Sequence, residues 1–230
     1  MQNLNYLTIK SRNFFLNFLL DQIRKKFINK KIKILNIGCA DCSYDIEIIN
    51  FLKKNNFTFS FVSSDIKDGV INTQRLKELK KFDWKFKKNK LDLSNSKQKY
   101  DIILHHDVLE HSFNPYKFIK NIKKSLNKNG LHIFTTPNLF RVANIFKLNF
   151  FKLNFPKKMG FSSFSKIGNE VHVKEYTRWD IKLLLGELKF KNIKIHCYYL
   201  GTKFMNLDEL LSLKAKNFNY GQNLFVSSQK

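Results

Sequence analysis

The sequence predicts an α/β fold: a doubly wound, mostly parallel sheet with helices on both faces. Apolar, β-branched segments alternate with segments of helical spacing over the first 140 of the 230 residues. Several of the apolar segments end at a glycine or an acid, and ligands of such sheets bind at the carboxyl ends of the strands. The chain is 43% hydrophobic, which suffices for one sizeable core, so we expect a single domain over residues 1–230.

The N-terminal segment, residues 1–30, is expected to be helical. Residues 13–27, NFFLNFLLDQIRKKF, predict an amphipathic basic helix that packs on the domain, with attachment to a membrane surface as the alternative. The apolar run is short, is broken by Asn17 and lacks a small-residue cleavage site. It therefore predicts neither a signal peptide nor a membrane span, and a cytoplasmic protein is the expectation.

The next segments alternate between the two patterns. Pro115 stands in the first turn of one predicted helix and Gly130 follows its end, which is the usual arrangement of these residues. The fourth predicted strand runs into an acidic, histidine-rich turn. Strands are expected at 31–38, 57–66, 84–95, 99–111 and 131–138, and helices at 43–55, 73–82 and 115–130.

Residues 139–170 interrupt this alternation. They are aromatic and basic without a clean period, and we interpret them as an insertion that covers the crevice at the strand ends. Order returns at 171–190, where Thr177 is expected to cap a helix. Residues 191–201 and 221–230 are expected to close the sheet as an antiparallel pair.

The chain is strongly basic, with 42 Lys and Arg against 18 Asp and Glu and a net charge of +24. Such a balance suits a protein that binds nucleic acid or an anionic membrane surface. The chain is also rich in Lys, Asn, Ile and Phe, which have A/T-rich codons, so a biased genome is an equally good explanation. The charge alone does not decide between these explanations.

Two of the three cysteines form the pair Cys39-Ala-Asp-Cys42, directly after a predicted strand. An odd number of cysteines in a chain of this length argues against a disulfide scaffold. A redox pair or a zinc site is one interpretation, but zinc needs about four ligands and only Cys197 remains as a third thiol. The other interpretation is a ligand-binding turn, in which Gly38 brings the backbone close to a ligand at a helix N-terminus.

Acids at the ends of the next two strands favour the turn. Asp65 ends the second strand, where it is placed to accept hydrogen bonds from a ribose diol. Asp92 ends the third, where it can accept from an adenine amino group or reach it through its backbone. A glycine turn followed by two such acids therefore predicts a nucleoside-containing cofactor.

Together these segments resemble the class I S-adenosylmethionine-dependent methyltransferases over roughly residues 30–200. ILNIGCADCS resembles the first motif of that family, and SSDI and LDLSN resemble its ribose and adenine motifs. DVLEH, followed by a helix, NG and a strand ending in TPN, is the most specific stretch, and HVKEYT resembles a later helix start. The resemblance implies a Rossmann-like sheet of seven strands and S-adenosylmethionine as the cofactor. It implies these cofactor-binding residues: Asn36, Gly38, Cys39, Asp65, Ile66, Asp92, Leu93, His105 and His106.

The first motif departs from the family pattern at three positions. Asn36 stands where an acid is usual, which puts in question one water-mediated contact to the methionine part of the cofactor. Ala40 and Cys42 replace the second and third glycines. We expect Ala40 to be tolerated and Cys42 to narrow the site.

Methyl transfer to a hydroxyl needs a base or a metal ion to remove or polarise the proton. The spacing of Asp107, Glu110 and His111 puts them about one helical turn apart on one face, and His172 begins the later motif. Small-RNA 2′-O-methyltransferases and ubiquinone-pathway O-methyltransferases carry a similar turn, and in the former a later histidine completes a divalent-metal site. This resemblance implies that the four residues are catalytic and bind a divalent cation. Alternatively, Glu110 and His111 only cap the helix and shape the pocket wall.

The resemblance favours O-methylation of a small molecule or a glycan precursor. The insertion carries basic residues interleaved with phenylalanine, which suit an anionic or lipid-linked acceptor, a phosphorylated sugar or RNA. These basic residues are Arg141, Lys147, Lys152, Lys157 and Lys158. RNA 2′-hydroxyl methylation is the alternative activity, and a non-catalytic binder of nucleic acid or a membrane surface is the alternative of another class. The oligomeric state is left open.

Overall fold

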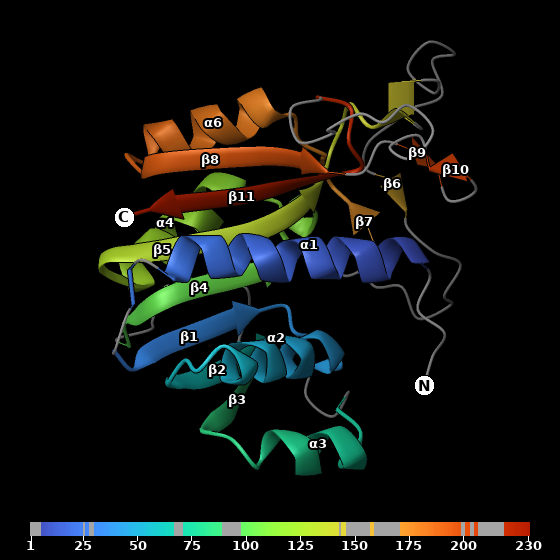
Figure 1. The fold of residues 1–230 in the computed structure, drawn as a ribbon. Helices are drawn as coiled ribbons and strands as arrows, with labels where there is room; N and C mark the ends of the chain where they lie inside the picture. Colours follow the sequence, from blue (N-terminus) through green and yellow to red (C-terminus); the bar gives the residue numbers. More distant parts are fainter. Residues whose placement is uncertain are drawn as a thin grey trace.

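A computed structural model of the chain describes residues 6–24, 26–27, 30–66, 71–88, 98–142, 144–145, 157–158, 171–198, 201–202, 205–206 and 219–230. Its largest sheet has seven strands in the order β3-β2-β1-β4-β5-β11-β8 (Figure 1). These strands are β1 (Ile32–Ile37), β2 (Phe59–Asp65), β3 (Trp84–Lys88), β4 (Tyr100–His106), β5 (Leu126–Pro137), β8 (Lys191–Tyr198) and β11 (Asn223–Gln229).

The strand directions confirm the predicted sheet. β1 to β5 pair with their neighbours in parallel, and β11 runs antiparallel between β5 and β8. The last strand of the chain is thus the antiparallel one, and it forms the expected pair with β8. The strand order reverses between β1 and β4, so the carboxyl edge at these two strands is where a sheet of this kind binds its ligand.

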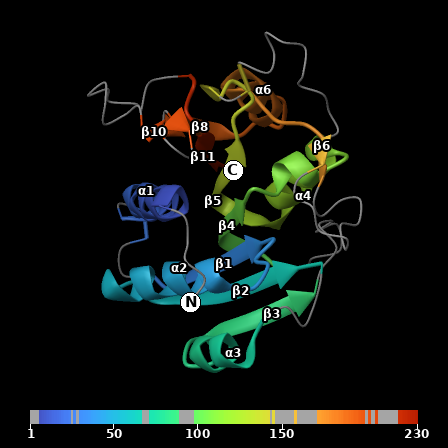
Figure 2. The same cartoon turned by 90° about the vertical axis from the view of Figure 1, so that its right-hand side faces the viewer.

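Helices cover both faces of the sheet (Figure 2). α1 (Tyr6–Ile23), α2 (Ser43–Lys54) and α3 (Thr73–Leu79) pack on one face, and α4 (Pro115–Ser125) and α6 (Arg178–Glu187) pack on the other. Successive side chains of β1 point to opposite faces of the sheet. Ile34 packs in the core under α1, α2 and α3, and Leu35 packs in the core under α4 and α6. Burial on both faces explains why the strand is rich in isoleucine and leucine.

The N-terminal helix begins and ends earlier than predicted. The sequence predicts it at 13–27, whereas α1 ends at Ile23. Phe15 and Leu19 are buried in the core that α1 shares with α2 and the sheet, so the helix packs on the domain as expected (Figure 1). Among the residues that the structure describes, no helix is long and apolar enough to cross a membrane.

The helix predicted at 115–130 is shorter in the structure. It ends early because Leu126 takes an extended backbone conformation and pairs with Tyr100 at the start of β4. The chain then turns at Asn129, whose φ is 62°, and regular pairing resumes at Leu131. The Asn-Gly pair therefore turns the chain inside β5 and does not end the helix.

Two predicted helix starts are confirmed. Pro115 occupies the first turn of α4, behind the cap Asn114. Thr177 caps α6, and its side chain and that of Asp180 each accept a hydrogen bond from the other residue's backbone N–H.

Several predicted features lie outside the described residues. β3 ends at Lys88, and the next described residue is Gln98, so Asp92 and Leu93 are not among them. Most of 139–170 is likewise outside, and its role as a cover stays a prediction. The short strands are β6 (Lys157–Lys158), which pairs with β7 (Val171–His172), and β9 (Gly201–Thr202), which pairs with β10 (Met205–Asn206).

Candidate active site

The first part of the site is the loop 38–42, which joins β1 to α2. Gly38 has a φ of 75°, and a Cβ atom there would lie 2.4 Å from a methyl group of Val108. The backbone N–H groups of Gly38 and Cys39 donate to the carbonyl of Ser64, over 2.7 and 3.1 Å. Only glycine combines this conformation with such a close approach, so the predicted tight turn is present.

Every second residue of this loop has a left-handed backbone. Ala40 has a φ of 47° and Cys42 a φ of 58°, in addition to Gly38. These are the positions where the related motif has its second and third glycines. The loop therefore keeps the backbone conformation of a glycine-rich turn although Ala40 and Cys42 have side chains. Each left-handed backbone costs about 1 kcal/mol of folding free energy.

Asp65 closes the loop from the neighbouring strand. Its Oδ2 atom accepts the backbone N–H of Ala40 over 2.7 Å, so the carboxylate lies directly beside the bend. Ile66, the next residue, is half-buried. An acid at the end of β2, next to a glycine turn at the end of β1, is the arrangement that binds a ribose.

A buried polar chain lies beneath the loop. The Nδ2 atom of Asn36, in β1, donates to Oδ1 of Asp45, in α2, over 2.6 Å. The other carboxylate oxygen accepts from the hydroxyl of Ser63, which in turn accepts from the indole N–H of Trp84 over 2.7 Å. Burial raises the pKa of Asp45 to about 6. Asn36 is a predicted site residue, whereas Asp45, Ser63 and Trp84 were not predicted.

The cysteine pair belongs to the same loop. Cys39 and Cys42 are buried free thiols, and one ligand atom of each lies within 4.8 Å of a carboxylate oxygen of Asp45. A hydrogen bond with Cys42, and then burial, raises the pKa of Cys39. Thiolates perform redox and metal chemistry, so a raised thiol pKa favours the turn interpretation. Cys197 is buried in the core on the other side of the sheet.

The two histidines at the end of β4 lie on opposite faces of the sheet. His105 is fully buried, its Nε2 atom lies 3.0 Å from Nε2 of His132, and its ring stacks on Phe134. The expectation that His105 lines the cofactor pocket is therefore not met, because its ring belongs to the core beside α4. The ring of His106 packs on Phe15 of α1 and Tyr44 of α2, with ring centres 4.2 and 4.4 Å apart.

Asp107 and Glu110 follow β4 at the carboxyl edge. Asp107 is exposed, has a φ of 50°, and accepts a hydrogen bond from the hydroxyl of Thr135 over 3.1 Å. Glu110 is fully buried, and its Oε2 atom accepts from the hydroxyl of Thr136 over 3.0 Å. Its Oε1 atom has no hydrogen-bond partner. Burial, and then the charge of Asp107, raises the pKa of Glu110 well above its usual value.

His111 and His172 meet beside Glu110. The Nδ1 atom of His111 lies 2.9 Å from the carbonyl of Val171, and Nδ1 of His172 lies 2.9 Å from a carboxylate oxygen of Glu175. Both partners accept, so both Nδ1 atoms carry a proton, and in the neutral tautomer of each ring the lone pair is on Nε2. Nε2 of His172 faces the unpartnered Oε1 of Glu110 at 3.9 Å.

Three of the four predicted ligands thus form one group. One ligand atom from each of Glu110, His111 and His172 lies within 4.8 Å of the other two, whereas Asp107 is outside this group. Imidazoles that bind a metal usually donate their second ring N–H to a carboxylate or a backbone carbonyl, as both do here. The orphaned Glu110 oxygen and the two Nε2 atoms therefore fit a divalent cation.

Glu175 is the main site residue that was not predicted. It is fully buried, and besides His172 its carboxylate accepts from Arg141 and from Asn144, each over 2.6 Å. Arg141, expected to contact the substrate, is thus ion-paired within the site. The spacing H-x-x-E at 172–175 was the available sequence signal, because it places a carboxylate next to the imidazole in a tight turn.

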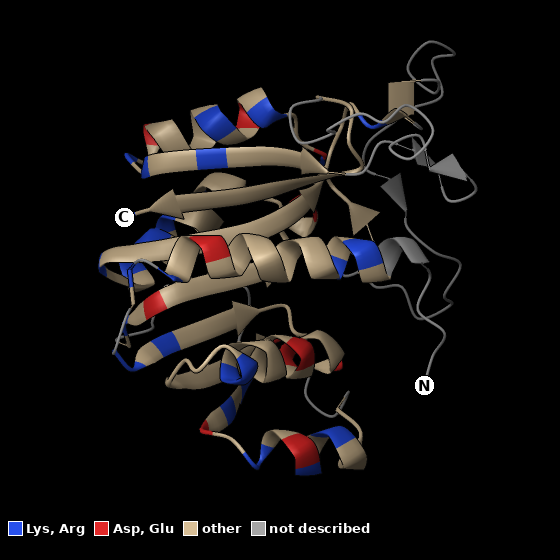
Figure 3. Cartoon of the chain, viewed as in Figure 1, with Lys and Arg blue, Asp and Glu red and all other residues tan. Residues whose placement is uncertain are grey.

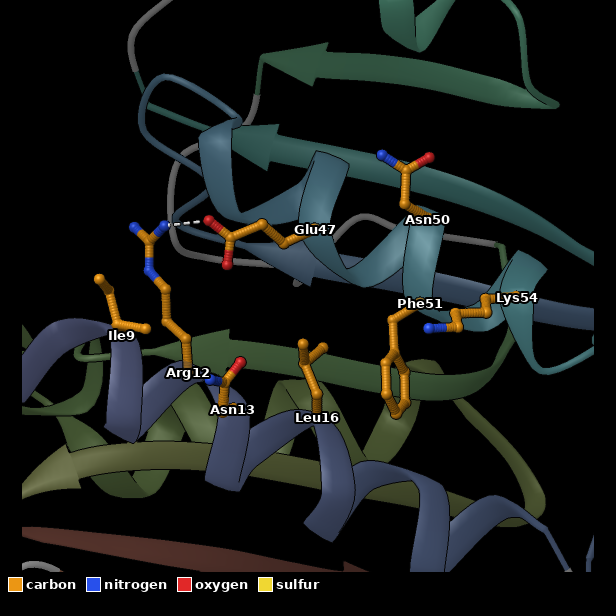
Figure 4. Close-up of a pocket in the computed structure, with 8 residues that line it drawn as sticks. All are labelled: Ile9, Arg12, Asn13, Leu16, Glu47, Asn50, Phe51 and Lys54. Carbon is orange, nitrogen blue, oxygen red and sulfur yellow. Dashed lines mark hydrogen bonds and ion pairs between the residues drawn. The ribbon is translucent and has the colours of Figure 1, made fainter. Parts of the chain in front are cut away.

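A groove of about 470 Å³ lies elsewhere, between α1 and α2 (Figure 4). The guanidinium of Arg12 forms an ion pair with Glu47 across it, at 2.5 Å. None of the predicted site residues is among the eight that line it. They are Ile9, Arg12, Asn13, Leu16, Glu47, Asn50, Phe51 and Lys54.

The basic residues of the described chain are spread widely. Figure 3 shows Lys and Arg on α1, α2, α3, α6 and β8, with acidic residues between them on the helices. No single described element carries the excess charge, and four of the five basic residues singled out in the insertion have side chains outside the described set.

Comparison with known proteins identifies relatives. Residues 28–179 match the family described as "Methyltransferase domain". The search of curated proteins found no match. Similar solved structures include the carbon methyltransferase CurJ, with a TM-score of 0.64 and 13% identity over 95% of this chain and 53% of that one. This chain therefore spans about half the length of CurJ.

Two further structures match over most of both chains. One is the N-methyltransferase NodS from Bradyrhizobium japonicum WM9 in complex with S-adenosylhomocysteine, with a TM-score of 0.61 and 12% identity over 99% of this chain and 89% of that one. The other is the magnesium protoporphyrin IX methyltransferase ChlM from Synechocystis PCC 6803 with the same ligand bound. Its TM-score is 0.63, with 14% identity over 100% of this chain and 90% of that one. At these identities the likeness shows the fold. CurJ is a carbon methyltransferase and NodS an N-methyltransferase, so the methylated atom differs among the neighbours.

Proposed function

The chain belongs to the class I S-adenosylmethionine-dependent methyltransferases, and we propose that it methylates a hydroxyl oxygen of a small molecule or a glycan precursor. The observation that carries the proposal is the meeting of Glu110, His111 and His172 at the carboxyl edge of the sheet. A hydroxyl needs help to lose its proton, and this group offers it. A carbon acid or a protonated nitrogen must also lose a proton, so the choice of a hydroxyl is part of the proposal.

The loop 38–42 and Asp65 are the proposed cofactor cradle. When bound, S-adenosylmethionine supplies an electrophilic methyl group on a sulfonium. Gly38 packs against Val108 at a tight bend, and this bend is proposed to present the loop backbone to the cofactor, with Asp65 placed for the ribose hydroxyls. Cys39, Ile66 and His106 are proposed to line the pocket, and Asp92 and Leu93 to contact the adenine.

His172 is the proposed general base. Its Nδ1–H donates to the buried carboxylate of Glu175, so Nε2 carries the lone pair that accepts the hydroxyl proton. Glu175, which forms an ion pair with Arg141 over 2.6 Å, then stabilises the imidazolium that forms. Glu110, 3.9 Å from Nε2, is placed to orient the hydroxyl. We propose that Asp107, at the exposed rim, contacts the acceptor.

As the alternative to base catalysis, a divalent cation is proposed at Glu110, His111 and His172. It would take the Nε2 lone pair of His172 in place of the proton, polarise the acceptor hydroxyl and lower the pKa of that hydroxyl. Because Asp107 lies outside the group, the donor set is two imidazoles and one carboxylate. That set suits Mn²⁺ better than Mg²⁺, which prefers oxygen ligands alone.

A turnover assay tests this function. Formation of S-adenosylhomocysteine is measured with a panel of hydroxylated small molecules and nucleotide sugars, and with single-stranded and duplex RNA. For the wild type we expect turnover with a member of the first panel. Methylation of RNA alone would support the 2′-hydroxyl alternative, and salt-dependent RNA binding without cofactor binding would support the non-catalytic one.

Three variants assign the residues. We expect Glu110→Gln and His172→Ala each to lower turnover by about 100-fold or more, with the Kd for S-adenosylmethionine unchanged in calorimetry. His196→Gln, a histidine of β8 outside the group, is the matched control and should retain activity. Unchanged turnover in both site variants would remove the base and the metal proposals together.

A further inference from the structure

Large apolar side chains are exposed mainly on one side of the molecule. Of the six in the described part of the chain, four lie on α6, on α4 or in the turn that leads into α4, and the other two are Ile9 of α1 and Tyr220. The four are Phe113, Tyr116, Trp179 and Leu183. Single exposed apolar residues are ordinary, but a group of them on one side indicates a surface that binds a partner.

The outer side of α6 carries two of these residues. Trp179 and Leu183 are four residues apart, so they lie on the same side of the helix, and they are 54% and 67% exposed. The opposite side already buries Ile181 and Leu185 in the core. A helix that packs on a domain with one apolar side normally presents polar residues on the other. The ring of Trp179 meets Phe140 edge-on, with ring centres 6.0 Å apart, and over half of the residue still faces solvent.

α4 lies next to α6 on the same face of the sheet (Figure 2). The Nζ atom of Lys123, in α4, donates to the carbonyls of Leu188 and Lys189, at the end of α6, over 2.6 and 3.0 Å. The outer sides of the two helices therefore form one surface. We call it the α4–α6 face, which comprises the exposed side chains of residues 113–125 and 178–187.

The α4–α6 face is basic. α4 carries four lysines and no acid, and α6 carries Arg178 and Lys182 against Asp180 and Glu187. Asp180 belongs to the capping box of α6 and forms an ion pair with Lys174 over 3.3 Å. The three helices on the opposite face of the sheet, α1, α2 and α3, carry six basic residues and four acids in all. Exposed apolar groups and an excess of positive charge thus coincide on one face.

We propose that the α4–α6 face docks on the surface of a lipid bilayer that contains anionic phospholipids. Tryptophan and tyrosine rings favour the level of the head groups, and leucine and phenylalanine favour the boundary of the acyl chains. Lysines beside them are attracted to the negative surface of the bilayer. A helix with exposed apolar residues and lysines is the usual form of such a contact.

The same features fit other macromolecules less well. Single-stranded RNA stacks its bases on aromatic rings along a basic groove, whereas the aliphatic side chain of Leu183 gives a base nothing to stack on. Protein interfaces are depleted of lysine, whereas α4 carries four lysines. An anionic lipid surface uses the apolar and the charged groups together.

The α4–α6 face begins beside the proposed active site. Phe113 follows His111 by two residues, and α6 begins at Arg178, three residues after Glu175. Docking through this face would hold the site at the membrane surface, so the acceptor class that follows is a glycan precursor carried on a lipid. This choice of acceptor rests on the proposed function, whereas the docking does not.

Co-sedimentation of the full chain with vesicles tests the docking, without cofactor or acceptor. We expect the wild type to bind vesicles of phosphatidylcholine and phosphatidylglycerol at least about tenfold more tightly than vesicles of phosphatidylcholine alone. Trp179→Ser combined with Leu183→Ser should weaken binding to the anionic vesicles by about tenfold or more. Ile9→Ser, at an exposed apolar site of α1, is the matched control and should stay within about twofold of the wild type. No binding by the wild type, or an equal loss in the control, would overturn the docking.

A second pair of variants tests the charge. Lys120→Gln combined with Lys124→Gln, on α4, should weaken binding to the anionic vesicles by about tenfold or more. Lys53→Gln combined with Lys54→Gln, on α2, removes the same charge from the opposite face and should have a much smaller effect. Equal losses in the two pairs would show that net charge drives binding without this face, which also overturns the proposal.

Fluorescence locates the contact, because the chain has two tryptophans. In Trp84→Phe the emission comes from Trp179, and it should shift to shorter wavelength on anionic vesicles and be quenched by brominated lipids. In Trp179→Phe the emission comes from Trp84, and neither change should occur. An unshifted Trp179 in vesicle-bound protein would overturn the proposal even if the serine variant does not fold.

Two outcomes separate this inference from the proposed function. A wild type that docks on vesicles but does not bind S-adenosylmethionine would refute the proposed function and leave the docking intact. A wild type that methylates a water-soluble sugar and does not bind vesicles, or that binds single-stranded RNA instead of vesicles, would refute only the docking.

Discussion

The Nδ1 atom of His172 lies 2.9 Å from Oε1 of Glu175, and this contact sets the state of the whole ring. Because Nδ1–H donates to the carboxylate, the neutral ring has its lone pair on Nε2, which faces Glu110. Glu175 is fully buried and also accepts from Arg141 and Asn144, so it is rigidly held. Its position makes Glu175 the support on which the proposed catalytic role of His172 depends.

The first prediction concerns this support. Glu175→Gln should lower turnover by about 10- to 100-fold, because the neutral amide orients His172 less well and does not stabilise its charged form. The Kd for S-adenosylmethionine should stay within about threefold, since Glu175 is outside the cofactor loop. Steady-state kinetics and calorimetry on the same preparation measure both. Glu187→Gln, an exposed glutamate of α6, is the control, and a loss of activity equal in the two variants would contradict the assignment.

The second prediction concerns metal dependence. Dialysis against a chelator should lower turnover, and Mn²⁺ should restore it more effectively than Mg²⁺, because two of the three proposed ligands are imidazoles. Mn²⁺ binding itself can be followed by electron paramagnetic resonance. His111→Ala should weaken it by about tenfold or more, since one of three protein ligands is lost.

The Asp107→Asn variant distinguishes a metal site of three residues from the set of four, including Asp107, that the sequence resemblance implies. Asp107 lies outside the group and accepts from Thr135, so this variant should bind Mn²⁺ within about threefold of the wild type. A loss as large as that of His111→Ala would show that Asp107 is a ligand after all. Turnover that is insensitive to the chelator would leave His172 and Glu110 acting without a metal.

The third prediction concerns the loop. Ala40→Gly should raise the free energy of unfolding by about 0.5–1 kcal/mol, because Ala40 has a φ of 47° and is exposed, so glycine relieves strain without leaving a cavity. Urea denaturation measures the change. Lys53→Gly, at an exposed site inside α2, should have the opposite effect by about 1 kcal/mol. A destabilised Ala40→Gly variant would show that the loop is not strained at this position.

Much of the fold could be predicted because it depends on local patterns. The two-sided apolar strands, the cap at Thr177 and the proline at the start of α4 depend on neighbours in the sequence, and all are confirmed. The predicted end of α4 is wrong because pairing between Leu126 and Tyr100, which are distant in the chain, overrides the local signal. Register between strands is a tertiary property that no single segment encodes.

The same distinction applies to the site. The turn with Glu110 and His111 and the distant His172 could be named from motifs, and the structure brings them together. The partners that hold these residues could not be predicted from motifs. Thr136 lies on β5, and Asn144 lies in residues 139–170, which interrupt the alternation of strands and helices. His105 was misplaced because the alternation along β4 sends it into the core, where His132 of β5 meets it.

The last prediction concerns acid stability and the buried pair His105 and His132. Burial lowers the pKa of His132 from 6.5 to about 3 and that of His105 well below its usual value, so both imidazoles are neutral in the folded protein. The unfolded chain binds these protons below about pH 6.5, so it binds more protons than the folded chain there, and stability rises with pH. The contribution is fully present above about pH 6.5 and is lost as the pH falls.

His132→Phe removes one of these groups and keeps a ring of similar size. The slope of the unfolding free energy between about pH 4 and pH 6 should therefore fall by about 1.4 kcal/mol per pH unit relative to the wild type, as measured by urea denaturation. Phe134→Leu, which alters the stacked neighbour without removing a titrating group, should shift the free energy by a similar amount at every pH. The raised pKa of Asp45 acts in the opposite direction, but it is common to all three proteins and cancels in the difference. An unchanged slope in His132→Phe would mean that the imidazole pair already carries a proton in the folded state.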